Sequence, residues 1–380
     1  MLKVLTAGES HGRFLVGILE GMPAGIEISE KYVREFLKRR RGGYGRGRRM
    51  KFEEDNFQII GGVIGGRTTG APFAVMVENS GARDLEKEPP QRVPRPGHAD
   101  FPGSLKYGFT DNFVPVIERS SARETAVRTA VLSITHKFLH DIGINVIGFT
   151  RAIGSIEVRD IPRSFDEILE KREKSMFYFP DPDVDGEAKK LVDQAIEAGE
   201  TLGGVFEVRV YGVPPGLGSY VDPFRRLDGR IAGIVMSLNA VKAVEIGDGI
   251  EISGKSGSEA VDEFEIEGGV KRRTNRSGGI EGGMTNGEVV VVRGYMKPIS
   301  TMRRKKMSFD LKTLAMKPAP YIRSDTVVVP AASVIAEVLV SYVIADAVLE
   351  KFGGDTLGDV VKAIGFYRDR IKKYFPSSHL

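Results

Sequence analysis

The most apolar stretch of the chain, residues 327–349, constrains the fold more than any other feature, because so hydrophobic a segment has to leave water. It is long enough to cross a membrane, but Glu337 and Asp346 interrupt it, and charged side chains are costly inside a bilayer. The segment therefore predicts a long helix, residues 331–351, that is buried within the protein and does not span a membrane.

Helical and strand-like patterns alternate irregularly along the rest of the chain. Apolar residues at helical spacing predict helices, and short apolar runs between glycine turns predict strands. The expected helices cover residues 29–41, 121–141, 165–174, 187–198 and 231–238, and the expected strands cover residues 57–64, 73–77, 144–149, 153–158, 205–210 and 288–292. Residues 80–111 are expected to form a long loop and residues 296–307 a basic loop. No repeat or flexible linker divides the sequence, so residues 1–380 are expected to form one mixed α/β domain.

The absence of cysteine among the 380 residues excludes a disulfide framework, a thiolate metal site and a cysteine nucleophile. The first residues run directly into a strand-like segment and do not show the hydrophobic core of a signal peptide. Both features favour a cytoplasmic protein in a reducing compartment.

Positive charge is concentrated in residues 34–51, where nine lysines and arginines stand against one acid. This segment carries a net charge of +8, so the rest of the chain carries −4, although the whole chain carries +4. Ser29 is expected to cap the helix and Gly42 and Gly43 to end it, which places the arginines at its C-terminus and in the glycine-rich loop that follows. Guanidinium groups bind carboxylate and phosphate with paired hydrogen bonds, which favours a small ligand with several anionic groups.

Single-stranded RNA is the alternative ligand of this loop, because Tyr44 and the arginines could stack on bases. RNA-binding segments of this composition are usually long and repetitive, whereas this one is a single loop at a helix end. The local concentration of charge therefore favours one anionic ligand and no nucleic acid.

Two histidines stand in glycine-containing turns, where they could approach a ligand closely. His11 lies in the sequence Gly-Glu-Ser-His-Gly directly after the first strand, and His98 lies near Arg95 and Asp100 in the long loop. A histidine can donate or accept a proton near neutral pH, so both are candidate acid–base residues. For His11 taken alone, a structural role in the turn is an equally open interpretation.

The segment from Arg119 to Thr125 places hydroxyl and guanidinium groups at the start of a helix. Free backbone N–H groups at a helix N-terminus bind phosphate, and here Arg119 and Arg123 flank Ser120 and Ser121. A phosphate site is therefore expected, although a simple serine cap would explain the serines alone.

Two further motifs are weaker. Residues 249–256 match the phosphate-binding pattern G-x-x-x-x-G-K-S, but the β-branched Ile250 and Ile252 stiffen the loop and no magnesium-binding strand follows, so we interpret the match as coincidental. His136 and His140 lie four residues apart on one helix, a spacing that could bind metal. No acidic third ligand accompanies them, so a pair on the helix surface and no metal site are expected.

Eight segments together resemble the signatures of the chorismate synthase family, in the family's order and across nearly the whole chain. They are GESHG at 8–12, RRRGGYGRGRR at 39–49, RPGHAD at 95–100, RSSARET at 119–125, MSLNAVKAVEIGDG at 236–249, SGGIEGG at 277–283, MKPIST at 296–301 and RSD at 323–325. The resemblance implies an α+β fold, a β-α-β sandwich with helices layered between two antiparallel sheets, and a homotetramer. It also implies a lyase of aromatic amino acid biosynthesis. This lyase performs the last step of the shikimate pathway, in which 5-enolpyruvylshikimate 3-phosphate loses phosphate by 1,4-elimination to give chorismate.

The resemblance also assigns site residues by their positions in these segments. The substrate would contact Ser10, Arg40, Arg46, Arg49 and Arg123. The positions of Arg40 and Arg46 are also described for the family as binding a dinucleotide (NADP), but we interpret them as substrate contacts. Reduced FMN would contact Ser121, Ala122, Arg123, Asn239, Ala240, Gly282, Lys297, Pro298, Ile299, Ser300, Thr301 and Arg323.

Three residues have catalytic roles in the mechanism that the resemblance implies. His98 would protonate the departing phosphate, His11 would protonate the reduced flavin, and Asp325 would relay a proton at the flavin N5. The motif of Asp325 reads Arg-Ser-Asp here, whereas some relatives have Arg-His-Asp, so Asp325 is the residue carried over for catalysis. The sequence shows no flavin-reductase domain, which implies the monofunctional bacterial type, supplied with reduced FMN by a separate NADH- or NADPH-dependent reductase.

Overall fold

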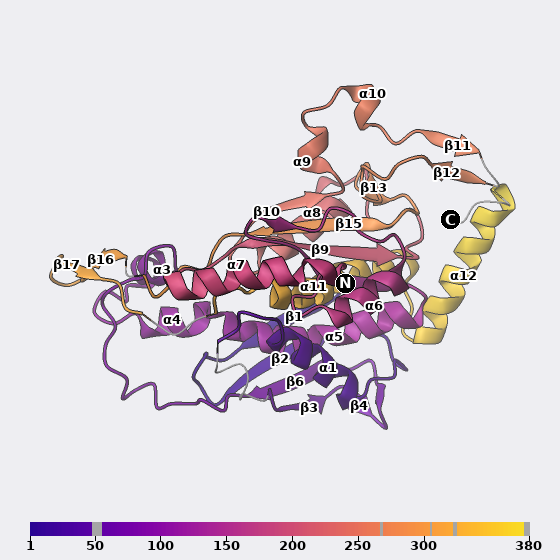
Figure 1. The fold of residues 1–380 in the computed structure, drawn as a ribbon. Coiled ribbons are helices and arrows are strands. Elements are labelled where there is room, and N and C mark those ends of the chain that lie inside the picture. Colours follow the sequence, from indigo (N-terminus) through magenta and orange to yellow (C-terminus); the bar gives the residue numbers. More distant parts are fainter. Residues whose placement is uncertain (48–54, 267–268, 305, 322–324, 376–380) are drawn as a thin grey trace.

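Two antiparallel sheets face each other across a layer of helices in the computed structural model (Figure 1). The structure describes residues 1–47, 55–266, 269–304, 306–321 and 325–375. One sheet contains, in spatial order, β1 (Lys3–Ala7), β2 (Phe14–Glu20), β6 (Phe73–Glu78) and β3 (Phe57–Gly61). The other contains β10 (Val241–Ile246), β15 (Val290–Met296), β9 (Gly204–Tyr211), β7 (Asn145–Ile153) and β8 (Ile156–Glu157). The strand pairs in both sheets are antiparallel, which confirms the predicted sandwich.

The layer between the sheets contains α1 (Glu30–Arg41), α5 (Thr125–Asp141), α8 (Leu227–Met236) and α11 (Val329–Phe352). α5 and α11 pack against each other at the centre, with α5 against β2 and β6 and α11 against β7 and β9. α11 is the predicted buried helix, and 89% of its most apolar window is buried inside the protein. A helix enclosed in this way has to be apolar around its whole circumference, which explains the composition of residues 327–349.

Both acids that interrupt this apolar stretch are buried and have partners on other elements. Asp346 accepts a hydrogen bond from the backbone N–H of Leu2 (2.5 Å) and pairs with Arg230 on α8 (2.5 Å). Glu337 pairs with Arg39 on α1 (2.9 Å). The core tolerates these charges because each is paired and connects α11 to a neighbouring element.

The four-stranded sheet has one buried and one exposed face. In β2, Leu15 and Leu19 point toward the helices and are fully buried, whereas Phe14 and Ile18 point outward and are 42% and 40% exposed. A Cβ on Gly17 would lie 3.0 Å from a side chain of α5, so the helix approaches the strand too closely for a larger residue. The alternation along β2 therefore follows directly from packing against α5 on one face.

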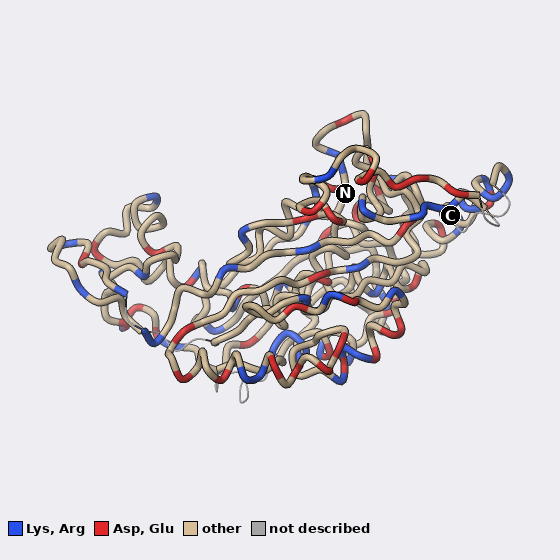
Figure 2. The backbone as a smooth tube through the Cα atoms, turned by 45° about the horizontal axis from the view of Figure 1, so that its top comes forward, with Lys and Arg blue, Asp and Glu red and all other residues tan. Residues whose placement is uncertain are grey.

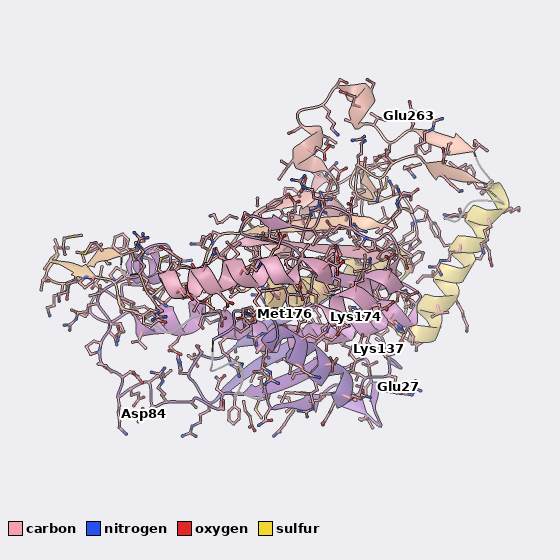
Figure 3. The ribbon with its side chains drawn as sticks, in the orientation of Figure 1. Glu27, Asp84, Lys137, Lys174, Met176 and Glu263 are labelled. Carbon is pink, nitrogen blue, oxygen red and sulfur yellow. The ribbon has the colours of Figure 1, made fainter. Side chains whose placement is uncertain are left out.

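The remaining elements lie around the two sheets or connect them. The further helices and helical turns are α3 (Asp100–Tyr107), α4 (Val114–Ser120), η1 (Ala122–Glu124), α6 (Phe165–Lys174), η2 (Pro182–Val184), α7 (Asp185–Ala198), η3 (Pro223–Arg225), α9 (Gly249–Ile252), α10 (Gly257–Ala260) and α12 (Leu357–Tyr374). Short hairpins join β4 (Val63–Ile64) to β5 (Arg67–Thr68), β11 (Phe264–Ile266) to β12 (Val270–Arg272), β13 (Ile280–Glu281) to β14 (Met284–Thr285) and β16 (Met307–Phe309) to β17 (Met316–Pro318). Acidic and basic residues are interspersed along the outer elements (Figure 2), and Asp84 and Glu263 lie at opposite ends of the molecule (Figure 3).

The predicted long loop at residues 80–111 contains α3, so this part of the prediction is wrong. α3 begins at Asp100, and Pro102 lies in its first turn, where a missing backbone N–H costs no hydrogen bond. Gly108 ends the helix in the left-handed conformation (φ 74°). The proline and glycine that suggested a loop are therefore compatible with the two ends of a short helix.

Several other predicted elements have different limits in the structure: the helix predicted at 231–238 is α8, residues 227–236, and the strand predicted at 57–64 is divided into β3 and β4. β7 is continuous to residue 153, where the sequence predicts two separate strands, and β15 extends to residue 296 instead of ending at 292. Both strands pair with β9 along its length, and this long-range pairing extends them beyond their local pattern. The helix predicted at 121–141 begins as the turn η1, and α5 follows from Thr125.

Candidate active site

The last turn of α1 carries the first arginines toward the start of α5. Ser29 caps one end of this helix and Gly42 follows the other, as the sequence predicts. Arg40 is 4% exposed, and it donates hydrogen bonds to Asp55 Oδ2 (3.3 Å) and Thr125 Oγ1 (3.1 Å). The end of α1 and the described part of the following loop, residues 39–47, are called the arginine loop here. They therefore pack against the predicted phosphate site at the start of α5.

Asp55 is central to this cluster, although the sequence analysis does not single it out. Its side chain is 1% exposed and pairs with Arg40, with Arg41 (3.8 Å) and with Arg123. Arg123 also donates to Asn79 Oδ1 (2.7 Å). One buried carboxylate thus joins two segments that are far apart in the sequence, the end of α1 with Arg40 and Arg41 and the turn that carries Arg123. The sequence contains one signal for this role: Asp55 closely follows a basic segment, and clustered basic side chains need a negative counter-charge.

The buried arginines differ in how far carboxylates compensate their charge. Burial would lower the pKa of Arg39, but Glu337 outweighs this effect and raises the pKa above its ordinary value. For Arg40, burial outweighs the attraction of Asp55, neighbouring arginines add repulsion, and the pKa falls to about 10. Among the described residues, the single carboxylate of Asp55 pairs with Arg40, Arg41 and Arg123, so Arg40 lies in a surplus of positive charge, as expected at a site that receives an anion.

Arg46 and Asp325, which belong to different motifs, form an ion pair in the arginine loop. Arg46 Nη1 lies 2.8 Å from Asp325 Oδ2, and the backbone N–H of Gly47 donates to Asp325 Oδ1 (2.7 Å). Both oxygens of Asp325 therefore hold the loop in place. Arg49 and Arg323, two further predicted site residues, lie outside the described residues.

His11 is held by Glu118 on α4. His11 Nδ1 lies 2.8 Å from Glu118 Oε1, and the backbone N–H of His11 donates to Glu118 Oε2 (2.7 Å). The backbone N–H of Ser10 donates to the carbonyl oxygen of Glu118 (3.2 Å). Burial alone would raise the pKa of the Glu118 carboxyl, but the hydrogen bonds from His11 lower it below its ordinary value. The two predicted residues of this turn are therefore anchored by an acid that the sequence analysis does not identify.

His98 stands beside a second buried carboxylate. His98 Nδ1 lies 2.6 Å from Asp100 Oδ1, and Arg95 donates to Asp100 through Nε (2.7 Å) and Nη2 (2.9 Å). Burial alone would raise the pKa of Asp100, but the hydrogen bonds from Arg95 and His98 lower it well below its ordinary value. The proximity of these three residues, which the sequence indicates, is confirmed.

Hydrogen bonds link several segments that the sequence predicts to hold FMN. Asn239 Nδ2 donates to the carbonyl oxygen of Ser120 (3.1 Å), and the backbone N–H of Lys297 donates to the carbonyl oxygen of Ala240 (3.0 Å). Lys297 Nζ donates to the carbonyl oxygen of Gly97 (2.7 Å). The start of α5, the turn before β10 and the segment after β15 therefore converge beside the loop that carries the second histidine.

The groups at this convergence suit an anionic cofactor. A Cβ on Gly97 would lie 3.3 Å from Lys297 Nζ and 3.4 Å from Ser300 Cβ, so glycine keeps the space in front of the ammonium group open. Ala240 adopts φ 70°, a left-handed conformation that costs energy for alanine and often marks a ligand site. An ammonium group, hydroxyl groups and an amide in one place fit the phosphate and polar groups of FMN.

The other predicted FMN residues differ in their placement. Ser121 accepts a hydrogen bond from the backbone N–H of Arg123 (3.3 Å), so it caps η1, the turn that leads into α5. Gly282 lies elsewhere, because the neighbouring Gly283 accepts from the backbone N–H of Leu227 at the start of α8 (2.9 Å). The turn before β10 follows the opposite end of this ten-residue helix, which is about 15 Å long. None of the backbone hydrogen bonds between described residues connects Gly282 to the other residues of the set.

Neither of the two weaker motifs forms a ligand site in the described residues. The start of the apparent phosphate-binding pattern is the short helix α9, and Lys255 is ion-paired with Glu251. His136 is not on the surface as predicted, because α1 and β7 cover it. Its Nδ1 lies 2.7 Å from Tyr32 Oη and its Nε2 lies 2.9 Å from a carbonyl oxygen of β7. The described residues contain no group of three side chains that could hold a metal ion.

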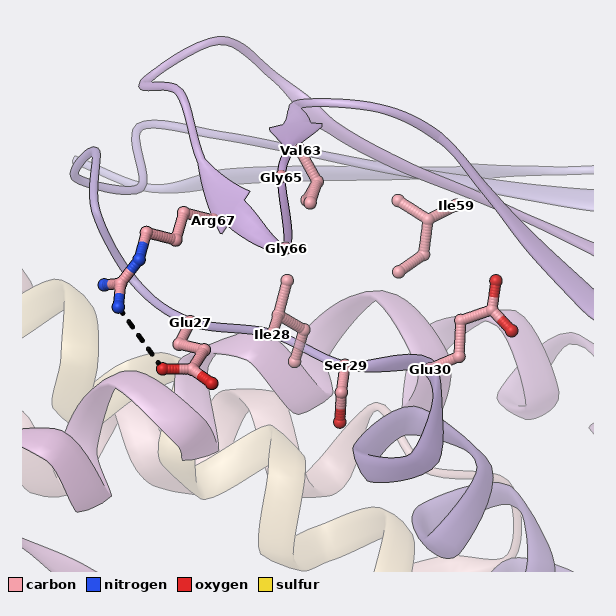
Figure 4. Close-up of a pocket in the computed structure, with 9 residues that line it drawn as sticks. All are labelled: Glu27, Ile28, Ser29, Glu30, Ile59, Val63, Gly65, Gly66 and Arg67. Carbon is pink, nitrogen blue, oxygen red and sulfur yellow. Dashed lines mark hydrogen bonds and ion pairs between the residues drawn. The ribbon is translucent and has the colours of Figure 1, made fainter.

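A surface cleft of about 530 Å³ lies near the N-terminal end of α1 (Figure 4). Its lining residues are Glu27, Ile28, Ser29, Glu30, Ile59, Val63, Gly65, Gly66 and Arg67. None of them is a predicted site residue, and the 12 residues of α1, about 18 Å, separate the cleft from the arginines. The predicted substrate-binding arginines therefore lie at the other end of α1, away from this cleft.

Comparison with known proteins identifies the family. A sequence profile described as chorismate synthase matches residues 2–349. The chain belongs to the chorismate synthase family. Chorismate synthases are carbon–oxygen lyases that release phosphate from 5-enolpyruvylshikimate 3-phosphate and require reduced FMN. As a member of this family, the chain is a lyase of aromatic amino acid biosynthesis that acts on a small anionic substrate.

Individual chorismate synthases agree with this assignment over their full length. A chorismate synthase of Desulforudis audaxviator (strain MP104C) is 46% identical, with 98% of this chain and 98% of the relative covered. One of Thermobifida fusca (strain YX) is 44% identical, with 98% and 99% covered. A crystal structure of chorismate synthase has a TM-score of 0.81 and 40% identity, with 98% of both chains covered. The sandwich described above is therefore the chorismate synthase fold.

Proposed function

We propose that the chain forms chorismate where the arginine loop, the turn of His11 and the loop of His98 meet the start of α5. One observation carries the proposal. The hydrogen bond between Lys297 Nζ and the carbonyl oxygen of Gly97 joins the predicted flavin segment to the loop of His98 across 200 residues of sequence. This bond supports a site in which the proposed cofactor contacts lie beside a proposed acid–base residue.

The arginine cluster supplies positive charge that can bind the negatively charged groups of the substrate. 5-Enolpyruvylshikimate 3-phosphate carries a phosphate and two carboxylates, and the surplus of positive charge at Arg40 favours such a ligand. A bound anion would provide the counter-charge that Asp55 alone does not supply. The proposed substrate contacts are Ser10, Arg40, Arg46, Arg49 and Arg123.

FMN is proposed to lie against the start of α5 and the segment after β15. When bound, reduced FMN supplies electron density to the substrate as phosphate leaves. The ammonium group of Lys297 and the hydroxyl groups of Ser300 and Thr301 would hold its anionic and polar groups. The other proposed contacts are Ser121, Ala122, Arg123, Asn239, Ala240, Pro298, Ile299 and Arg323, whereas Gly282, at the other end of α8, is not included.

Three residues are proposed to move protons. His98, held through Nδ1 by Asp100, gives a proton to the departing phosphate, and His11 holds a proton at the flavin. Asp325 relays a proton next to the flavin. Because Asp325 Oδ2 is paired with Arg46, an anionic substrate that binds Arg46 would compete for the arginine and release this oxygen.

An anaerobic assay with reduced FMN and 5-enolpyruvylshikimate 3-phosphate tests the proposal. Chorismate absorbance and free phosphate are expected to appear together. His98→Ala is expected to lower kcat by about 10² to 10⁴, the usual contribution of a general acid, with a much smaller change in KM. His140→Ala is the matched control, because this imidazole is 64% exposed on α5 and outside the site. Unchanged kcat in the His98 variant would remove His98 from the role.

The assembly is proposed to be a homotetramer. The outward face of the four-stranded sheet exposes Leu5 (73%), Phe14 (42%) and Ile18 (40%), and contiguous apolar surface of this kind marks association. A tetramer with three two-fold axes needs at least two kinds of interface, and this face would serve one of them.

We also propose that residues 1–380 form a single domain in the cytoplasm. One core cluster includes Phe73 from the first sheet, Phe206 from the second and Val338 from the helix between them, which supports one domain. The apolar helix α11 contributes buried residues to that core. A separate NADH- or NADPH-dependent reductase is proposed to supply reduced FMN, in keeping with the monofunctional type.

A further inference from the structure

Glu118 touches His11 at two points, although it lies just outside the segment RSSARET that the sequence analysis identifies. We propose that Glu118 is a positioning residue that fixes the ring of His11 so that proton transfer takes place at Nε2. The inference rests on the proposed function, because it presupposes that His11 moves a proton in the reaction.

The contacts hold both the backbone and the ring of His11. The carboxylate of Glu118 is 6% exposed, and its two oxygens accept separate N–H groups of one residue, the backbone N–H (2.7 Å) and Nδ1 (2.8 Å). The backbone N–H of Ser10 donates to the carbonyl oxygen of Glu118 (3.2 Å), and the backbone N–H of Arg83 donates to the carbonyl oxygen of His11 (2.9 Å). The ring cannot turn away without losing its bond to a buried carboxylate.

This geometry determines which nitrogen exchanges a proton. At 2.8 Å from a carboxylate oxygen, Nδ1 has to be the donor, because two acceptors at this distance would repel each other. Proton exchange with a ligand then has to use Nε2. The carboxylate also stabilises the positive charge that the ring carries while it holds a second proton. Among the other charged side chains of this region, Arg83 lies near the carboxylate of Glu118, Glu9 lies in the same turn as His11, and Arg119 donates to the carbonyl oxygen of Thr6 (3.0 Å).

Other histidines of the chain provide a comparison. His98 also has Nδ1 beside a buried carboxylate, 2.6 Å from Asp100 Oδ1, although Arg95 Nη2 lies 3.0 Å from the same nitrogen. His136 differs, because its Nδ1 contacts Tyr32 Oη (2.7 Å) and its Nε2 contacts a backbone carbonyl oxygen (2.9 Å). His11 therefore shares with the other proposed acid–base histidine a buried carboxylate partner at Nδ1, which His136 does not have.

Glu118→Gln tests the inference, because glutamine keeps the size of the side chain but loses the charge. We expect kcat for chorismate formation to fall by about 10-fold or more, with little change in KM, and the pH dependence of kcat to shift. Glu118→Asp retains the charge and is expected to restore the pH profile toward that of the original protein. Glu170→Gln, on the exposed side of α6, is the control for the amide substitution. A lower melting temperature with an unchanged pH profile would show that Glu118 has only a structural role.

A double-mutant cycle separates failure of this inference from failure of the proposed function. If Glu118 acts through His11, the variant carrying Glu118→Gln and His11→Ala is no slower than His11→Ala alone. If the reductions in turnover caused by the two substitutions multiply in the double variant, the inference is overturned. A turnover of His11→Ala equal to that of the unsubstituted protein would instead refute the proposed role of His11. FMN binding, followed by flavin fluorescence, is expected to persist in every variant, and its loss in Glu118→Gln would also contradict a positioning role.

Discussion

Counter-charge distinguishes the arginines that hold the fold from the arginine that faces a surplus of positive charge. Arg39 and Arg293 are largely buried, and carboxylates outweigh burial and raise the pKa of both. Arg40 is buried to a similar degree, but its pKa is lowered, to about 10. A guanidinium group that is buried without sufficient counter-charge raises the energy of the ligand-free protein, and an anionic ligand removes part of that cost.

Arg40→Lys is therefore expected to weaken substrate binding. Lysine keeps the charge but cannot form the paired hydrogen bonds of a guanidinium group. The loss of a hydrogen bond to a charged group, about 1.5–3 kcal/mol, corresponds to an increase in KM of about 10- to 100-fold. Steady-state kinetics with reduced FMN measure the effect. Arg209→Lys, next to Glu207 on the other sheet, is the control, and an unchanged KM in the Arg40 variant would contradict the assignment.

At the scale of secondary-structure elements, the buried acid of α11 connects four neighbours. Glu337 pairs with Arg39 on α1 (2.9 Å) and Arg172 on α6 (3.0 Å), and it accepts a hydrogen bond from the backbone N–H of Gly148 on β7 (2.9 Å). His136 on α5 lies 3.4 Å away. Since Arg39 and Arg40 are adjacent in the last turn of α1, this network also fixes the helix end that carries the arginine loop.

Glu337→Gln is expected to destabilise the protein by about 3–5 kcal/mol, because buried Arg39 loses its carboxylate partner and buried Arg172 keeps only the half-exposed Glu173. Urea unfolding measures the change. Glu173→Gln is the matched control, since Glu173 also contacts Arg172 (2.7 Å) but is 48% exposed. A loss of stability in the Glu337 variant no larger than in the control would show that the network contributes little.

The buried carboxyls of these elements predict stability that is lost in acid. The pKa values of Asp100, Glu118 and Glu337 lie below their ordinary values of 3.8, 4.5 and 4.5. Between the lowered and ordinary values the unfolded chain binds protons that the folded chain does not, so stability rises with pH in this window. Their contribution is complete above about pH 5 and is lost as the pH falls toward the lowered values.

The melting temperature is therefore expected to fall as the pH decreases from about 5 to about 3, and to fall less steeply in Glu337→Gln. Calorimetry or circular dichroism at several pH values measures both slopes. Parallel curves for the two proteins would show that Glu337 contributes nothing to the acid dependence.

At the scale of the whole molecule, the two sheets present different outer faces. The four-stranded sheet exposes apolar residues such as Leu5 and Ile18, whereas Glu207, Arg209 and Arg293 on the five-stranded sheet form a charged network that is largely buried. An apolar sheet face in water favours association with a second copy more than a charged face does.

Ile18→Lys is accordingly expected to reduce the mass of the assembly, because it places a charge at the centre of the proposed interface. Light scattering coupled to gel filtration measures the mass. Ile250→Lys, at a residue that is 56% exposed on α9, is the matched control. A mass unaffected by the Ile18 substitution would exclude this face as an interface.

The sequence by itself determined what depends on neighbours along the chain. Ser29 and Gly42 mark the ends of α1, and the apolar stretch at residues 327–349 predicts a buried helix, because capping and periodicity are local properties. The eight ordered segments also sufficed to indicate the family. The proline- and glycine-rich segment that contains α3 was the exception, since its composition resembles that of a loop.

The tertiary structure alone decided which charges meet. Glu118 and His11 are 107 residues apart, Asp55 and Arg123 are 68 apart, and nothing in the local pattern of either pair indicates a contact. Such pairs form because packing of the sheets and helices brings their elements together, and burial then makes an unpaired charge costly. The identity of the candidate site residues was thus accessible from motifs, whereas the carboxylates that orient and balance them became visible only in the fold.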